Sequence, residues 1–168
     1  MLIYTIFKTR YGFVGVAATS AGLSRLILPQ GSKSSILSSI KNGFEGRRDD
    51  EYFKSLRDEL TSYFQGRRCL FDYPLDLEKA TSYQKKIWEV TRSIPWGETH
   101  SYKWVAERIG CPVSYRAVGQ ALKRNPLPII IPCHRVIGFN GSLSGFSGGI
   151  IWKERLLEIE RVGNNCHA

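Results

Sequence analysis

A cysteine and a histidine stand side by side as Cys133-His134, directly after the apolar run 129–131 and Pro132. A thiolate attacks electrophiles and a thiol hardly does, so a cysteine with an ordinary pKa of about 8.5 needs a neighbour that takes its proton. His134 is the natural candidate for that base. The other interpretation is a buried structural cysteine beside a histidine at a strand end, and the pair alone leaves it open.

The segment that must position this pair is predicted to be helical. Residues 81–84 match a capping box, and the helix that follows is broken by Pro95 and Gly97. Ser101 can cap a short helix that stops at Gly110, and Ser114 can cap a second one that ends at 125–126. Two brief helices joined by a glycine-containing turn resemble a helix-turn-helix.

The first part of the chain has the pattern of strands. Residues 2–8, 13–18 and 23–28 are short β-rich runs separated by turn signals, which predicts a small antiparallel sheet. Asp49 and Asp50 can cap a helix over 53–64 that covers this sheet. The predicted fold is α/β of the α+β kind. A strand-rich domain over 1–78 precedes a mostly helical domain over 79–168, which holds the helix-turn-helix and the active site.

The net charge of +9 is concentrated in one segment. Between Ser101 and Arg135, six lysines and arginines stand against one glutamate. A local basic excess favours polyanion binding, because neutralising phosphates releases counterions. No run of about 20 apolar residues and no signal peptide is visible, which predicts a soluble, unexported protein.

The four cysteines lie far apart and form no CxxC pair, so a zinc site or a disulfide framework is poorly supported. A reducing compartment fits best. Cys166-His167 near the end of the chain could bind a metal only adventitiously, so we expect no metal site.

Several further motifs occur in one order along the second part: 83–88, 94–97, 101–102, 116–119, 125–126, 131–136 and 147–149. Together these motifs resemble the O6-alkylguanine-DNA alkyltransferases, or methylated-DNA–protein-cysteine methyltransferases. The first part matches this family only in length and strand content, and the resemblance implies a ribonuclease H-like domain there. The implied substrate is double-stranded DNA that carries O6-alkylguanine or O4-alkylthymine.

The resemblance also implies a role for individual residues. Cys133 is the alkyl acceptor, and His134 and Glu160 complete a water-linked proton relay. Tyr102 helps to rotate the lesion and hydrogen-bonds the departing guanine, and Arg116 fills the space that the base leaves. The remaining implied DNA or substrate contacts are the bracing Asn125, the Ser147 hydroxyl, the Val136 carbonyl, and Ser101, Ala117 and Gly119 of the helix-turn-helix. Tyr102 as an ordinary half-buried tyrosine and Asn125 as a plain helix cap remain alternatives.

Two of these residues stand out by their position in a helix. Glu160 falls in the apolar arc of the predicted helix over 149–162, where a carboxylate needs a partner. Orienting His134 is one such role, and an ion pair with Lys153 on the same arc is the alternative. Gly119 lowers helix stability by about 1 kcal/mol relative to alanine, so either another helix or a DNA groove approaches closely there.

The implied chemistry is an in-line displacement at a carbon attached to the guanine oxygen. Its thioether product has no ready leaving group, so each molecule should act once and needs no cofactor. The base must first be turned out of the duplex. We expect a monomer, in the cytoplasm or, in a eukaryote, in the nucleus.

Two other functions fit parts of the sequence. A lesion sensor of the alkyltransferase-like kind lacks the acceptor cysteine, whereas Cys133 is present here. A helix-turn-helix regulator with a sensing cysteine would need a dimerisation segment or an appended regulatory region, and neither is recognisable in the sequence.

Overall fold

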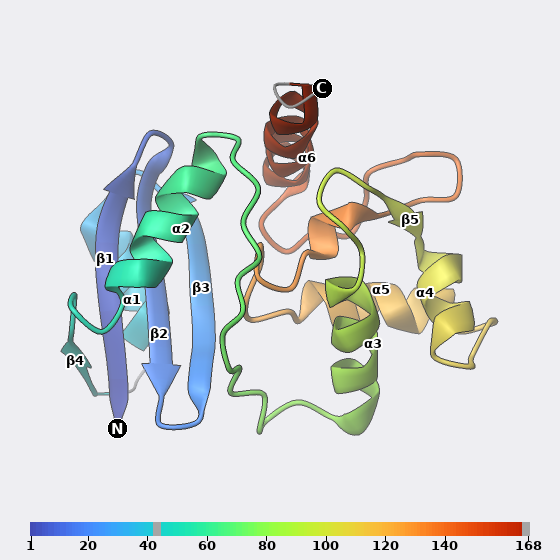
Figure 1. Cartoon of the computed structure of the whole chain (residues 1–168). Helices are drawn as coiled ribbons and strands as arrows, with labels where there is room; N and C mark the ends of the chain where they lie inside the picture. Colours follow the sequence, from blue (N-terminus) through green and yellow to red (C-terminus); the bar gives the residue numbers. More distant parts are fainter. Residues whose placement is uncertain (42–44, 166–168) are drawn as a thin grey trace. The chain divides into compact units, whose positions relative to one another are not determined.

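The structure is a computed structural model that describes residues 1–41 and 45–165. The chain divides into two compact units, Met1–Leu77 and Glu78–Ala168, both drawn in Figure 1. Cys166 and His167 lie outside the described residues.

The first unit is built on a four-stranded sheet with the strand order β3-β2-β1-β4. Strands β1 (Leu2–Thr9), β2 (Gly12–Thr19) and β3 (Gly22–Gln30) pair antiparallel through two tight turns. They confirm the three predicted strands. A short fourth strand, β4 (Gly46–Arg48), lies parallel to β1 and was not predicted, so the sheet is mixed.

Two helices cover the two faces of this sheet, with α1 (Lys33–Lys41) behind it and α2 (Lys54–Phe64) in front of it in Figure 1. Ile36 and Ile40 of α1 form a core cluster with Ile6 of β1. Helix α1 was not predicted, because only two of its side chains are fully buried and the others are mostly serine and lysine. Its helical period is therefore weak in the sequence.

The start of α2 corrects one prediction. Asp49 and Asp50 do not cap this helix, which begins at Lys54 after Phe53 with no side-chain cap. Asp49 Oδ1 instead accepts from the Tyr52 amide at 3.1 Å, in the turn that precedes the helix. Asp50 Oδ1 accepts from Thr5 Oγ1 at 2.6 Å and so ties this turn to the sheet.

The second unit is mostly helical. Its helices are α3 (Ser82–Arg92), α4 (Tyr102–Arg108), α5 (Tyr115–Lys123) and α6 (Ile150–Asn165). The predicted capping box is confirmed, since Thr81 Oγ1 accepts from the Gln84 amide and Gln84 Oε1 accepts from the Thr81 amide. Ser101 caps α4 by accepting from the Trp104 amide at 3.1 Å. Ser114 stands at the N-cap of α5, but its side chain makes no capping bond, so that prediction is wrong.

A small parallel pair of strands positions the Cys-His motif. Strand β5 (His100–Ser101) pairs with β6 (Val136–Ile137), with His100 opposite Val136. Strand β5 leads directly into α4, and β6 directly follows the short 3-10 helix η1 (Cys133–Arg135). The start of α4 is therefore held beside the segment that carries Cys133. None of the helices in the described ranges is long and apolar enough to cross a membrane.

Candidate active site

Cys133 is the first residue of η1, not the end of a strand, and only 3% of its surface is exposed. Its sulfur accepts a hydrogen bond from Asn125 Nδ2 at 3.1 Å. Burial disfavours the thiolate and raises the pKa of Cys133 to about 11, although the Asn125 bond and the charge of Lys153 act in the opposite direction. In the free protein the sulfur is therefore held as a thiol.

His134 and Glu160 form a direct pair. His134 Nε2 lies 2.6 Å from Glu160 Oε1, and both side chains are fully buried, one from η1 and one from α6. A buried carboxylate behind an imidazole fixes its tautomer and stabilises the imidazolium. The arrangement equips the histidine that follows Cys133 in the chain to accept a proton.

Arg135 binds the same carboxylate, a contact that no pattern in the sequence indicates. Its Nε lies 2.9 Å from Glu160 Oε2 and its Nη2 lies 3.0 Å from Oε1, while Nη1 donates to the Ile94 carbonyl at 2.6 Å. The Gly97 amide donates to Glu160 Oε2 at 3.2 Å. These bonds explain the motif 94–97, whose turn supplies one backbone acceptor and one donor to the buried ion pair.

The charges of these groups follow from their contacts. Burial opposes the charge of Glu160, but the hydrogen bonds and charges of His134 and Arg135 outweigh it and hold the pKa of this carboxyl at about 2. Burial lowers the pKa of His134, which its bond to Glu160 only partly offsets. At neutral pH the site thus holds a neutral imidazole able to take a proton.

Asn125 organises the turn between α5 and the cysteine. Its Nδ2 also donates to the Ile131 carbonyl at 2.8 Å, and its Oδ1 accepts from the Leu127 amide at 2.9 Å. Within this turn Ile129 has φ of 75°, which is strained for a β-branched residue. A side chain with both a donor and an acceptor is needed to hold the turn, so Asn125 is more than a plain helix cap.

Tyr102, at the start of α4, meets α6 and the loop over 140–149, which precedes α6 and is called the wall loop below. Its hydroxyl donates to the Ser144 carbonyl at 2.7 Å, and Lys153 Nζ donates to the Tyr102 oxygen and to the Ser144 carbonyl, each at 3.1 Å. The alternative of a Lys153–Glu160 ion pair is wrong, because Glu160 pairs with His134 and Arg135. A Cβ on Gly119 would stand 3.7 Å from the Tyr102 ring, an ordinary contact distance.

The other predicted contact residues lie around this cluster. Arg116 and Ala117 are exposed on α5, and Ser147 is exposed in the loop before α6. Val136 is fully buried in β6, directly after η1. Over residues 1–41 and 45–165, neither Arg116 nor Ser147 is hydrogen-bonded to the cluster around Cys133.

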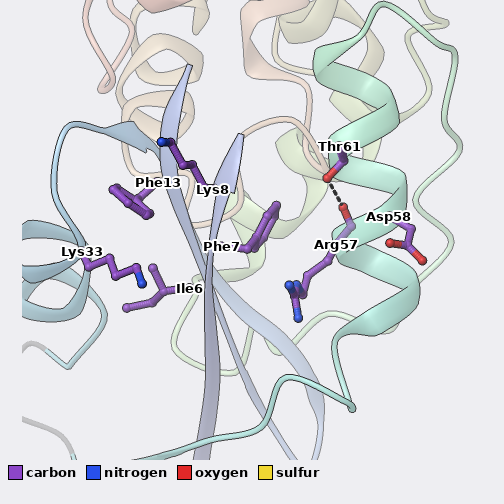
Figure 2. Close-up of a pocket in the computed structure, with 8 residues that line it drawn as sticks. All are labelled: Ile6, Phe7, Lys8, Phe13, Lys33, Arg57, Asp58 and Thr61. Carbon is purple, nitrogen blue, oxygen red and sulfur yellow. Dashed lines mark hydrogen bonds between the residues drawn. The ribbon is translucent and has the colours of Figure 1, made fainter. Parts of the chain in front are cut away.

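The first unit has a hollow of its own, of about 370 Å³, shown in Figure 2. Ile6, Phe13 and Lys33 lie on one side of β1, and Phe7 and Arg57 lie on the other. Its lining includes three basic side chains but no cysteine or histidine (Ile6, Phe7, Lys8, Phe13, Lys33, Arg57, Asp58, Thr61). It therefore offers no counterpart to the nucleophile and base of the second unit.

Both units match known protein families. Residues 2–77 match the 6-O-methylguanine DNA methyltransferase ribonuclease-like domain, and residues 82–162 match the DNA binding domain of the same protein. The methylated-DNA–protein-cysteine methyltransferase of Methanosarcina acetivorans is 38% identical over 159 residues, which cover 95% of this chain and 98% of that protein. The constitutive enzyme of that name from Bacillus subtilis is 38% identical over 163 residues, covering 96% and 97%.

Solved structures agree with the sequence matches. The crystal structure of Mycobacterium tuberculosis OGT in complex with DNA is 38% identical, with a TM-score of 0.81 over 96% of this chain and 94% of that one. The O6-methylguanine-DNA methyltransferase from Pyrococcus kodakaraensis is 25% identical, with a TM-score of 0.71 over 95% and 99%. The chain therefore belongs to the 6-O-methylguanine DNA methyltransferase family.

Proposed function

We propose that this protein repairs DNA by transferring the alkyl group of O6-alkylguanine, and of O4-alkylthymine, to the sulfur of Cys133. The observation that carries the proposal is a buried cysteine followed directly by a histidine whose Nε2 is held 2.6 Å from a buried carboxylate. This arrangement adjoins two short helices with the order of a helix-turn-helix. Family membership of both units supports the same activity.

The reaction is a displacement at carbon. Through a bridging water, His134 takes the proton of Cys133, and Glu160 stabilises the imidazolium through its direct hydrogen bond to His134. The thiolate sulfur then bonds to the alkyl carbon, while the bond from that carbon to the guanine oxygen breaks. The product is a thioether that water does not hydrolyse, so one protein molecule removes one alkyl group. The damaged base supplies the alkyl group itself, and the reaction calls for no cofactor.

The base reaches the buried sulfur only after it leaves the duplex. We assign this step to α5, whose exposed Arg116 fills the space in the stack and whose Ala117 and Gly119 allow the helix to approach a DNA groove. Tyr102 lies against Gly119 and is placed to contact the rotated nucleotide. Ser101 and its capped helix end contribute to the same surface.

The extruded base is then bound between the wall loop and the segment after the cysteine. In this proposal Ser147 donates to the base oxygen, the Val136 carbonyl accepts from the guanine amine, and Asn125 braces the turn that presents Cys133. The two units correspond to a ribonuclease H-like domain over 1–78 and a DNA-binding catalytic domain over 79–168. We place the protein, as a monomer, where genomic DNA lies: in the cytoplasm, or in the nucleus of a eukaryote.

Two substitutions separate binding from chemistry. Cys133→Ala should retain binding to a duplex with O6-methylguanine and lose alkyl transfer completely. Arg116→Ala should slow transfer from the duplex much more than it weakens binding to undamaged DNA, because the vacated space is no longer filled. Equal transfer rates for Arg116→Ala and the parent, measured in single turnover with saturating duplex, would contradict the role of this side chain.

A further inference from the structure

The second half of strand β1 lies at an open edge of the sheet in the first unit. Strand β4 pairs only with residues 2–4 of β1, on the side away from β2. The Tyr4 carbonyl faces this side, because it accepts from the Asp49 amide at 2.9 Å. Backbone groups alternate in direction along a strand, so those of Ile6 and Lys8 face the same side. In the described part of the chain no strand pairs with β1 there, and residues 6–9 form an open edge.

The polar backbone groups of the open edge are nearly unused. Arg48 Nη2 lies 3.4 Å from the Ile6 carbonyl, a long hydrogen bond from a side chain that also pairs with Asp50. Within residues 1–41 and 45–165, no backbone hydrogen bond reaches Lys8 from this side. A row of unpaired amides and carbonyls is a template for another strand. The edge therefore offers main-chain donors and acceptors to an extended peptide.

The hollow of about 370 Å³ in Figure 2 is lined from both faces of the sheet at this edge. Ile6, Phe13 and Lys33 lie on one side of β1, and Phe7 and Arg57 lie on the other. A ligand that lay on one face alone would reach only one of these two groups. The side chains of an extended peptide alternate between the two faces of a sheet, so an added strand reaches both.

Each face of the hollow offers an aromatic ring and a cation. Lys33 Nζ lies 5.5 Å from the centre of the Phe13 ring, and Arg57 Cζ lies 5.5 Å from the centre of the Phe7 ring. Arg57 Nε is buried and has no hydrogen-bond partner among the described residues. The two faces therefore suit a segment that carries both apolar side chains and carboxylates.

The charge around the edge is one-sided. Exposed Lys8 adds a third positive charge to Lys33 and Arg57, and Asp58 is the one carboxylate among the lining residues. Over residues 1–41 and 45–165 none of the three cations forms a salt bridge. A lysine on an edge strand normally prevents pairing with other chains. Here the same charges would repel a second copy of this edge and attract an acidic strand.

DNA fits the hollow less well than a peptide does. Phosphates would accept from the three cations, but they carry no donor for the Lys8 carbonyl. They also provide no apolar group for the rings of Phe7 and Phe13. A peptide backbone satisfies both the amides and the carbonyls of the edge, and its side chains contact the rings.

We propose that the open edge of β1 binds an acidic, extended segment of another protein as an added strand. Main-chain hydrogen bonds to Ile6 and Lys8 attach the segment, and its carboxylates pair with Lys33 on one face and Arg57 on the other. All residues of the proposed alkyl transfer belong to the second unit. The edge is therefore a partner site in addition to that reaction.

The test uses a fluorescein-labelled peptide of the sequence DVVDDVVD with blocked ends, which presents both valine and aspartate on each face when extended. Fluorescence anisotropy with the full chain should show saturable binding. The same peptide with its central amides N-methylated keeps its charge and side chains but cannot pair as a strand, and it should bind about tenfold more weakly or less. Equal binding of the two peptides, or no binding of the first, would overturn the proposal.

Substitutions on the two faces give the second half of the test. Lys33→Glu and Arg57→Gln should each weaken peptide binding by about tenfold, because each removes a charge-assisted contact. The matched control is Lys54→Glu, an exposed position on α2 outside the hollow, which should change binding by less than about twofold. Circular dichroism checks the fold, and Lys33→Glu with the N-methylated peptide decides the question if Arg57→Gln does not fold.

Undamaged duplex DNA distinguishes the competing occupant. Lys33→Glu should leave duplex affinity and the rate of alkyl transfer within about twofold of the parent, while peptide binding falls. If the duplex displaces the peptide and Lys33→Glu weakens duplex binding equally, the cations belong to a nucleic-acid surface and the proposal is overturned. Unchanged peptide binding in Lys33→Glu would likewise overturn it.

Failure of alkyl transfer in the parent would instead concern the proposed function, which this peptide experiment does not use.

Discussion

The guanidinium of Arg135 holds both oxygens of Glu160, with Nε 2.9 Å from Oε2 and Nη2 3.0 Å from Oε1. The same carboxylate lies 2.6 Å from His134 Nε2. Two adjacent residues of η1 thus share one acid from α6. This sharing fixes the position of the histidine and also joins the turn over 94–97 to the site through the Ile94 carbonyl and the Gly97 amide.

Removal of the Arg135 side chain should strongly lower the free energy of unfolding. Arg135→Met leaves a buried carboxylate with one of its two charged partners missing, and breaking such a pair lowers the free energy of unfolding by about 3–5 kcal/mol. Urea unfolding at pH 7 measures this change. The control is Arg161→Met, which breaks an exposed pair with Glu158 and should leave stability nearly unchanged. Similar small effects of both substitutions would contradict the buried pair.

The free energy of unfolding should depend on pH through Glu160. Its pKa is about 2 in the folded protein and close to 4.5 when unfolded, so the unfolded state binds the proton first as pH falls. The stabilisation by this carboxylate is therefore present above pH 4.5 and is lost as pH falls through about 2. The stability of the parent relative to Glu160→Gln should decrease over that interval. A difference between the two proteins that does not change with pH would contradict the depressed pKa.

Substitution of Gly119 tests whether the small size of this residue serves the helix itself or its contact with DNA. A Cβ at this position meets the Tyr102 ring at 3.7 Å, so the free protein has room for alanine. Gly119→Ala should raise the free energy of unfolding by up to about 1 kcal/mol, because alanine is the better helix former. It should also weaken duplex binding, if the α5 face approaches the groove closely. Thermal unfolding and a DNA titration measure the two effects, and undiminished affinity would rule out that close approach.

Even the isosteric substitution of Asn125 by aspartate should change the pKa of Cys133. Asn125→Asp keeps the oxygen that accepts from the Leu127 amide and loses the donor to the Ile131 carbonyl and to Cys133 Sγ. Because the amide bond to the sulfur favours the thiolate, the substitution should raise the pKa of Cys133 further. The pH dependence of iodoacetamide alkylation measures this pKa. An unchanged or lower pKa would show that the amide does not stabilise the sulfur.

Much of the fold follows from local patterns. The strands over 2–30, the capping box at Thr81 and the serine cap of α4 are visible in the sequence, because each depends on neighbours a few residues away. The positions of Cys133, His134 and Glu160 also stand out locally, the last as a carboxylate on an apolar helix arc. The structure places His134 and Glu160 in direct contact.

The features that were missed depend on contacts distant in sequence. Strand β4 exists because it pairs with β1 more than 40 residues earlier, and its three residues carry no strand pattern of their own. Arg135 was overlooked because a charged residue after a cysteine and a histidine is ordinary until Glu160 is seen beside it. Lys153 shares a helix arc with Glu160, and this pattern suggested an ion pair between them. The hydrogen bonds of Lys153 instead go to residues of α4 and the wall loop.

The central claim concerns a sulfur that is consumed in a single reaction. Intact-protein mass spectrometry after incubation with excess duplex containing O6-methylguanine tests it most directly, followed by peptide mapping. The account predicts one added methyl group per molecule, located on Cys133, and no more lesions repaired than protein molecules present. Lesions removed in excess of protein, or removed while Cys133 keeps its original mass, would contradict it.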